Sequence, residues 1–138
     1  MEKYTTMIKE KSNKGKVLCG VAVSLSDSSV SELIGLSGYD FVWIEGEHGA
    51  LDRKDIQQHM TAAHAGGAAS LIRLANNNPD LVEPIIDMGT DIICFPFINT
   101  TQNAEKAVSA CTYPPYSYKR MQSSKSFLLW KYESFRLC

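Results

Sequence analysis

Two carboxylates and an imidazole follow directly after an apolar stretch of the sequence. The apolar residues 41–44 lead into Glu45, Glu47 and His48. A carboxylate next to an imidazole fixes its tautomer and stabilises its protonated form, as general acid–base catalysis requires. Because chemistry in α/β proteins collects where buried parallel strands end, this cluster is a candidate catalytic site. The alternative is a loop histidine in a salt bridge at a helix start.

Arg73 and Asp87 are the other two candidate site residues. Arg73 lies near the end of the apolar run 70–74, where a guanidinium must find anions or leave the core. The planar guanidinium group, with its N–H donors, can bind a substrate carboxylate or a developing oxyanion. The alternative is that Arg73 forms an ion pair with Glu45, Glu47 or Asp87. Asp87 stands at a predicted helix end, where the helix dipole disfavours negative charge, so it is either functional or a solvated surface acid.

Other residues that could do chemistry have simpler interpretations. His59 and His64 are five residues apart, which is not the spacing that places two ligands on one helical face, so we interpret both as surface or packing residues. Trp43, Phe95 and Phe97 are typical of the core of a sheet rather than of a binding site.

Composition limits the class of protein. A chain of 138 residues with 44% hydrophobic content fits one soluble domain that buries roughly two thirds of its unfolded surface. The net charge of −1, with basic residues scattered between acids, argues against nucleic acid as a partner. Residues 1–16 lack the apolar stretch of a secretory signal, and no segment approaches the roughly 18 apolar residues of a membrane span. We therefore expect a cytoplasmic protein.

The cysteines are widely spaced, at Cys19, Cys94, Cys111 and Cys138. No C-x-x-C pair suggests a zinc or redox site. We expect reduced thiols, with Cys19 and Cys94 as small buried hydrophobes.

Apolar runs alternate with segments of helical period from residue 17 to residue 110. Four strands are predicted at residues 17–25, 41–45, 69–74 and 91–95. Four helices are predicted at residues 30–36, from 53 to Gly66-Gly67, 79–88 and 102–110. Four successive βα units imply a parallel sheet with right-handed crossovers, an α/β fold.

Capping residues mark several of these helix ends. Ser29 and Glu32 match a capping box before the first helix. Asn78 is a good N-cap with Pro79 at the first helical position, and Gly89 is the expected stop of that helix.

The last part of the sequence differs from the rest. Residues 117–138 have no βα pattern and crowd lysine, serine and aromatic residues together. We therefore predict a boundary at 116, with residues 1–116 as one unit and 117–138 as an aberrant tail. One hypothesis is a frameshift near Lys119, which the coding DNA would test.

With these residues in view, the sequence resembles the HpcH/HpaI aldolase/citrate lyase family of class II, metal-dependent pyruvate aldolases. The resemblance runs from about residue 15 to residue 116. The stretches that carry it are Gly38–Gly49, Ile72–Leu74, Ile85–Gly89, Phe95-Pro96 and Tyr113-Pro114-Pro115.

The resemblance implies the N-terminal half of a TIM (β/α)₈ barrel whose complete chain has about 250 residues. It implies aldol cleavage or formation of 4-hydroxy-2-oxo acids, giving pyruvate and an aldehyde, with Mg²⁺ or Mn²⁺ as Lewis acid. His48 would be the acid–base residue, Arg73 would bind the keto or enolate oxygen, and Asp87 would be a supporting carboxylate. The family commonly has Asp where this chain has Glu45, so the pairing of Glu45 with His48 is left open.

The family's metal-binding Glu and Asp lie on later strands than the four predicted here. We therefore expect no metal ligands in this chain, no appreciable turnover, and an open sheet edge that favours a homo-oligomer. The competing interpretation is a non-catalytic half-barrel or homodimeric pseudoenzyme. A flavodoxin-like or phosphate-binding domain is disfavoured because no glycine-rich loop follows any strand.

Overall fold

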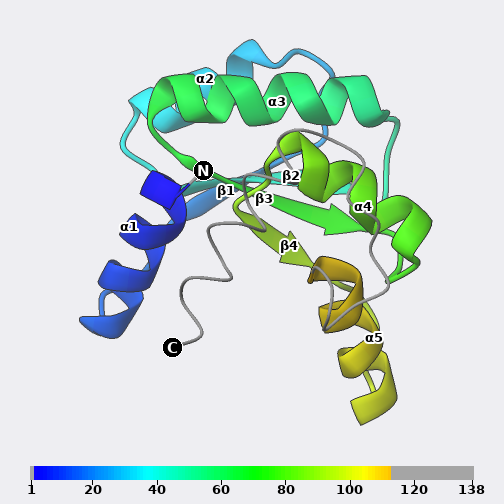
Figure 1. Ribbon diagram of the computed structural model, residues 1–138. Coiled ribbons are helices and arrows are strands. Elements are labelled where there is room, and N and C mark those ends of the chain that lie inside the picture. The colour runs from blue at the N-terminus through cyan, green and yellow to red at the C-terminus, as the bar shows by residue number, and fades with distance from the viewer. Residues whose placement is uncertain (1, 113–138) are drawn as a thin grey trace. The chain divides into compact units, whose positions relative to one another are not determined.

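The computed structural model describes residues 2–112 and contains one parallel sheet. Figure 1 shows its four strands, which lie side by side in the order β1-β2-β3-β4. All neighbouring strands are parallel. The strands are β1 (Gly20–Val23), β2 (Phe41–Gly46), β3 (Ala69–Leu74) and β4 (Ile92–Cys94). The predicted parallel α/β fold is therefore confirmed.

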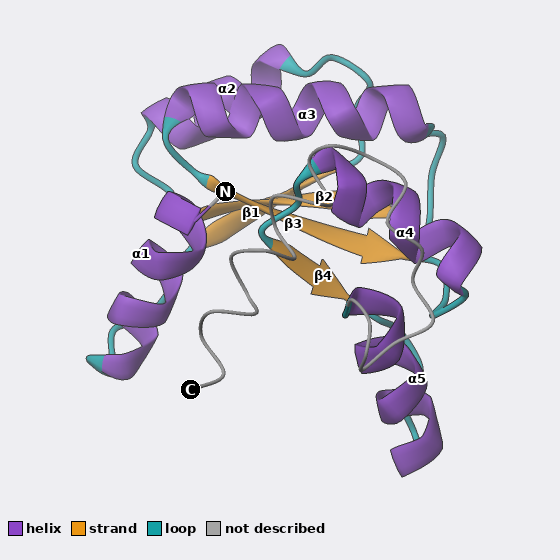
Figure 2. Ribbon diagram, viewed as in Figure 1, coloured by secondary structure: helices purple, strands orange, loops and turns teal. Residues whose placement is uncertain are grey.

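Helices alternate with these strands along the chain, as Figure 2 shows by colour. They are α1 (Glu2–Asn13), α2 (Ser29–Leu36), α3 (Arg53–Gly66), α4 (Pro79–Met88) and α5 (Thr101–Cys111). The chain forms two compact units. Within the described residues, the first comprises 2–76 with Gly89–Pro96, and the second comprises Asn77–Met88 with 97–112.

In the first unit, α2 and α3 pack against each other and against one face of the sheet. Alternate strand residues supply the core of this layer, and Val42, Ile44 and Ile72 are completely buried. On each strand, the residues that alternate with these buried residues point their side chains to the opposite face of the sheet. The sheet therefore has one face covered by α2 and α3 and one face on which polar residues can gather.

The second unit contains α4 and α5, which contact each other. The Asn77 side-chain amide donates a hydrogen bond of 3.1 Å to the backbone carbonyl of Asn103. The apolar residues buried on the two helices are Val82, Ile85, Ala107 and Ala110.

Helix α3 begins and ends as the sequence predicts. Asp52 is its N-cap, accepts hydrogen bonds from the backbone N–H groups of Lys54 and Asp55, and forms a reciprocal capping box with Asp55. Gly67 ends the helix with φ +93°, a left-handed conformation that favours glycine.

The predicted capping box of Ser29 and Glu32 is wrong. Ser29 is the first residue of α2, and its backbone N–H and hydroxyl both donate to Asp27 Oδ1, at 3.0 and 2.8 Å. Ser28 is at the N-cap and makes no side-chain cap bond. The upstream aspartate is therefore the acceptor that orders this turn.

The ends of some predicted elements also differ. The first strand covers residues 20–23 rather than 17–25, with Val17 85% exposed before it. Helix α1 was not expected from the sequence. Cys19 is exposed and Cys94 half-buried rather than both buried, although both are free thiols.

Of the three aromatic residues expected in the core, Trp43 and Phe95 are half-buried. Phe97, which follows β4, is 77% exposed and has a left-handed conformation with φ +55°. The predicted tail at residues 117–138, Cys138 and the Tyr113-Pro114-Pro115 stretch lie outside the described residues.

Candidate functional site

The register of the sheet brings Glu45 and Arg73 opposite each other at the carboxyl ends of β2 and β3. Cys94 of β4 is the next residue across, paired with Arg73. Ile44 and Ile72, one position earlier on their strands, are buried beneath the helices. Because successive side chains alternate, Glu45 and Arg73 lie on the face opposite α2 and α3.

Arg73 is held by two carboxylates. Its Nε donates to Glu45 Oε1 at 3.0 Å, and its Nη2 lies 2.5 Å from Glu45 Oε2, so the pair is bidentate. Nε also lies 3.2 Å from Glu47 Oε2. The side chains of Glu45 and Glu47 are only 12% and 8% exposed, against 29% for Arg73. The guanidinium thus remains the accessible member of the cluster.

His48 is connected to this cluster through its backbone. Its N–H donates to Glu45 Oε1 at 2.9 Å, and so does the N–H of Glu47. The imidazole is 74% exposed, with Nε2 3.8 Å from Glu47 Oε2. Glu47, rather than Glu45, is therefore the carboxylate beside the imidazole.

The electrostatics of the pair favour two charged groups. Burial raises the pKa of Glu45, but hydrogen bonds from Arg73 and from the backbone N–H groups of His48 and Glu47 outweigh burial and lower that pKa below its ordinary value. The hydrogen bond to Glu45 raises the pKa of Arg73. Both shifts favour the charged forms of Glu45 and Arg73.

Glycine at position 46 allows the end of β2 to pass close to the backbone of Arg73. A Cβ atom at position 46 would lie 2.7 Å from the backbone carbonyl oxygen of Arg73, closer than real Cβ atoms approach. Glycine therefore allows β2 to turn beside β3 and direct Glu47 back towards the guanidinium.

Asp87 lies on α4, near the end of that helix, and is half-buried. It belongs to the second unit, whereas Glu45, Arg73 and His48 belong to the first. Its membership of the site stays a prediction.

A second polar cluster, which the sequence did not reveal, lies at the amino end of the sheet. Asp91 Oδ2 is 2.6 Å from His64 Nε2 and accepts 2.8 and 2.9 Å hydrogen bonds from the backbone N–H and hydroxyl of Ser70. The ring of Tyr4 stacks on His64 with centroids 4.7 Å apart. These residues fasten α1, α3, β3 and β4 together, and only the strand register could have revealed them.

The sequence predicted that His59 and His64 are surface or packing residues, and in the structure both pack against neighbouring elements. His59 is fully buried and its Nδ1 lies 2.7 Å from Ser31 Oγ of α2, while His64 is part of the Asp91 cluster.

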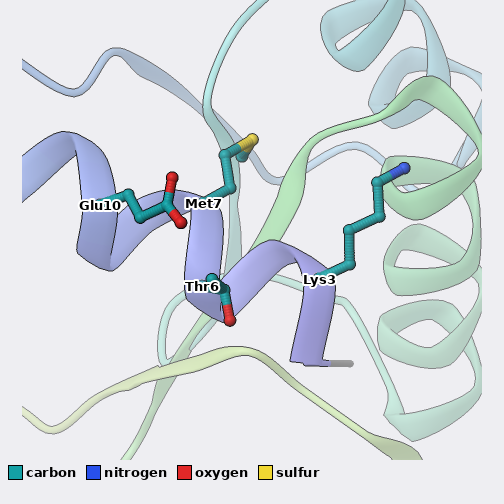
Figure 3. A pocket seen from close by; sticks show the side chains of 4 residues that line it. All are labelled: Lys3, Thr6, Met7 and Glu10. Carbon is teal, nitrogen blue, oxygen red and sulfur yellow. The ribbon is translucent and has the colours of Figure 1, made fainter.

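Figure 3 shows an open hollow beside α1, lined by Lys3, Thr6, Met7 and Glu10 on successive turns of the helix. Tyr4 and Lys11 attach α1 to the amino end of the sheet, through His64 and Asp40. The hollow is therefore separate from the Glu45–Arg73 cluster at the carboxyl end.

The described residues do not form a metal site. Within residues 2–112, no three histidine, cysteine, aspartate or glutamate side chains come together in a group that could hold a metal ion. The carboxylates of Glu45 and Glu47 both face Arg73 instead.

Four parallel strands that alternate with helices and lie in sequential order, with the Glu45–Arg73 ion pair at their carboxyl ends, have the arrangement expected for part of a TIM-type barrel. The family model described as HpcH/HpaI aldolase/citrate lyase matches residues 19–136. The chain belongs to this family of aldolases and lyases.

Curated relatives and solved structures agree with this assignment. A 2-keto-3-deoxy-L-rhamnonate aldolase from Escherichia coli is 30% identical over 87% of this chain and 45% of its own length. A hydroxypyruvate/pyruvate aldolase from Roseobacter denitrificans is 30% identical over 78% of this chain and 42% of its own. The crystal structure of an HpcH/HpaI aldolase from Desulfitobacterium hafniense matches the fold with a TM-score of 0.77 at 21% identity, over 87% of this chain and 47% of that one.

The chain thus spans about half the length of the curated relatives it matches. None of the helices within the described residues has the length and apolar character needed to cross a bilayer. Cytoplasmic location stays a prediction.

Proposed function

We propose that this chain carries the 2-oxo-acid-binding part of a class II pyruvate aldolase site. The reaction would be aldol cleavage or formation of a 4-hydroxy-2-oxo acid, giving pyruvate and an aldehyde. The observation that carries the proposal is the guanidinium of Arg73, held by Glu45 and Glu47 beside His48 at the strand ends.

Arg73 has donors left for a substrate. Glu45 and Glu47 contact only Nε and Nη2, and Nη1 has no hydrogen-bond partner among residues 2–112. A guanidinium offers five N–H donors in a planar fork that fits a carboxylate. Arg73 would therefore bind the carboxylate or keto oxygen of a 2-oxo acid and stabilise the charge of its enolate.

His48 is the proposed acid–base residue. Its backbone is anchored to Glu45, while its exposed imidazole can exchange a proton with water or substrate. Glu47 would stabilise the protonated imidazole, since its carboxylate is the nearest. Asp87 is proposed as a supporting carboxylate.

A divalent ion, when bound in aldolases of this class, acts as a Lewis acid for the enolate. Because the described residues include no group that could hold such an ion, we propose that this chain assayed alone gives no appreciable turnover.

Two measurements test the proposal. Oxalate, a planar dianion that resembles the pyruvate enolate, is titrated into the ¹⁵N-labelled full chain and followed by NMR. We expect saturable shifts at the backbone amides of His48 and Arg73, and loss of binding in Arg73→Ala but not in the control Arg53→Ala on α3. Absence of binding, or equal binding by Arg73→Ala, would contradict the proposed site.

The second measurement follows pyruvate release from a 4-hydroxy-2-oxo acid with Mg²⁺ or Mn²⁺ present. No release above the protein-free rate is expected, and robust turnover would refute the proposed inactivity of the isolated chain.

A second candidate function is a non-catalytic homodimer of half-barrels. The sheet order favours it, since β1 and β4 are edge strands within the described part of the chain and can pair with another copy. Light scattering distinguishes a discrete dimer, which supports this function, from a monomer, which excludes it.

A further inference from the structure

Trp43 lies beneath the guanidinium of Arg73. The Arg73 Cζ atom is 5.7 Å from the centroid of the indole ring, within the range of a cation–π contact. Trp43 is two residues before Glu45 on β2, so both side chains lie on the same face of the sheet. Trp43 pairs with Leu71 in the register, and Arg73 is two residues further along β3.

Placing the indole of Trp43 at this position is energetically unfavourable. Its Nε1 is buried and has no hydrogen-bond partner among residues 2–112. A buried donor without an acceptor is destabilising, whereas leucine or phenylalanine would fill this position without an unpaired N–H. What tryptophan adds is the strongest cation–π surface of any side chain. The contact with Arg73 is therefore the feature that accounts for this residue type.

The ring and the carboxylates constrain Arg73 in different ways. Glu45 and Glu47 fix the edge of the guanidinium that carries Nε and Nη2. A flat ring restricts rotation of the guanidinium plane about that edge. Together they determine the direction in which Nη1 points.

We propose that Trp43 is a positioning residue for Arg73, fixing the plane in which the guanidinium meets a planar carboxylate. This inference depends on the proposed function in one respect, which is that the anion bound by Arg73 is the carboxylate of a 2-oxo acid. It assigns to Trp43 a role that acts through Arg73 and involves no contact with substrate.

The test compares two substitutions in the full chain. Trp43→Leu removes the ring, and Trp43→Phe retains a ring but removes the unpaired N–H. Phe41→Leu is the matched control, because Phe41 lies on the same strand and face but pairs with Ala69, four residues before Arg73. The chain has four arginines, so the Arg73 Nε–H resonance can be assigned by its loss in Arg73→Lys.

The first readout is independent of any ligand. In the unsubstituted chain the Arg73 Nε–H resonance should be displaced by the ring current of Trp43 and protected from exchange. Trp43→Leu should move it towards the free-arginine position and speed its exchange, Trp43→Phe should restore much of both effects, and Phe41→Leu should change neither. An unchanged resonance in Trp43→Leu would overturn the inference.

The second readout is the oxalate affinity of each variant, measured beside its thermal unfolding midpoint. Trp43→Leu should weaken binding about fivefold to thirtyfold, and Trp43→Phe should recover most of that loss. If Trp43 had only a structural role, the oxalate affinity of each variant would follow its thermal unfolding midpoint. Oxalate affinities that rank in the same order as the unfolding midpoints would therefore overturn the inference. If the unsubstituted chain binds no oxalate while the Arg73 resonance still depends on Trp43, the proposed function fails and the positioning contact stands.

Discussion

Glu45 and Arg73 form a bidentate ion pair across β2 and β3, with contacts of 3.0 and 2.5 Å. The same carboxylate also accepts the backbone N–H of His48 at 2.9 Å. One side chain thus connects the proposed anion-binding residue to the main chain of the proposed acid–base residue.

Glu45→Gln should lower both the stability and the order of the site. The amide retains the size of the side chain and an acceptor for the His48 N–H, but it loses the charge that binds Arg73. We expect the unfolding midpoint to fall by several degrees and the amide of His48 to exchange faster. Glu47→Gln, which weakens a single 3.2 Å contact to Arg73 Nε and a 3.8 Å contact to the exposed imidazole of His48, should have the smaller effect. Equal effects would show that Glu45 has no special role.

The contribution of Glu45 to stability should disappear in acid. Its pKa in the folded protein is below its ordinary value of 4.5, so the folded state favours the ionised carboxylate. The stabilisation is therefore complete well above pH 4.5 and is lost as pH falls through the lowered pKa. Urea unfolding of the natural chain and of Glu45→Gln should differ at pH 7, and the difference should shrink as the pH is lowered below 4.5. A constant difference across this range would contradict the assigned cause of the shift.

Helix α1 should loosen when Asp40 is neutralised. Lys11 of α1 pairs with Asp40 Oδ1, while Oδ2 accepts the backbone N–H of Cys19 at 2.9 Å. Asp40→Asn retains an acceptor for Cys19 but weakens the attachment of Lys11. Hydrogen exchange of residues 2–13 should accelerate several-fold while that of β3 is unchanged. Lys9→Gln, an exposed change on the same helix, is the control, and an unaffected α1 would refute this role for Asp40.

The sequence predicted much of the fold because the signals for it are local. The run 69–74 and the Gly66-Gly67 pair placed β3 and the end of α3 correctly, since apolar periodicity and capping depend on neighbouring residues. Helix α1 was missed because its anchors, Asp40 and His64, are distant in the sequence.

The sequence likewise predicted the part of the candidate site that depends on neighbouring residues, but not the contacts between strands. Residue types and spacing brought Glu45, Glu47 and His48 together, but the sequence left open which of Glu45, Glu47 and Asp87 pair with Arg73. That choice depends on the register of β2 against β3 and on the turn after Gly46. The contact of Trp43 with Arg73 depends on the same register, which is why Trp43 was interpreted only as a core residue.

Asp91→Ala should be among the most destabilising substitutions in the first unit. The Asp91 side chain is completely buried and binds His64 and both the backbone and hydroxyl of Ser70. Removing it leaves the groups of His64 and Ser70 without their hydrogen-bond partner, which costs about 1–3 kcal/mol for each group left unpaired, and urea unfolding would measure the loss. Glu105→Ala, an exposed residue of α5, should cost far less, and a similar loss in both variants would contradict the assigned importance of the network.

Ser31 and His59 should prove energetically coupled across the α2–α3 contact. Both are completely buried, Ser31 Oγ lies 2.7 Å from His59 Nδ1, and His59 Nε2 has no partner among the described residues. Ser31→Ala leaves the imidazole with no hydrogen bond and should cost about 1–3 kcal/mol in the free energy of unfolding. His59→Leu removes the imidazole itself, so adding Ser31→Ala to His59→Leu should cost much less than Ser31→Ala alone. A double-mutant cycle by urea denaturation gives the coupling, and strictly additive losses would show that the short contact contributes no stability.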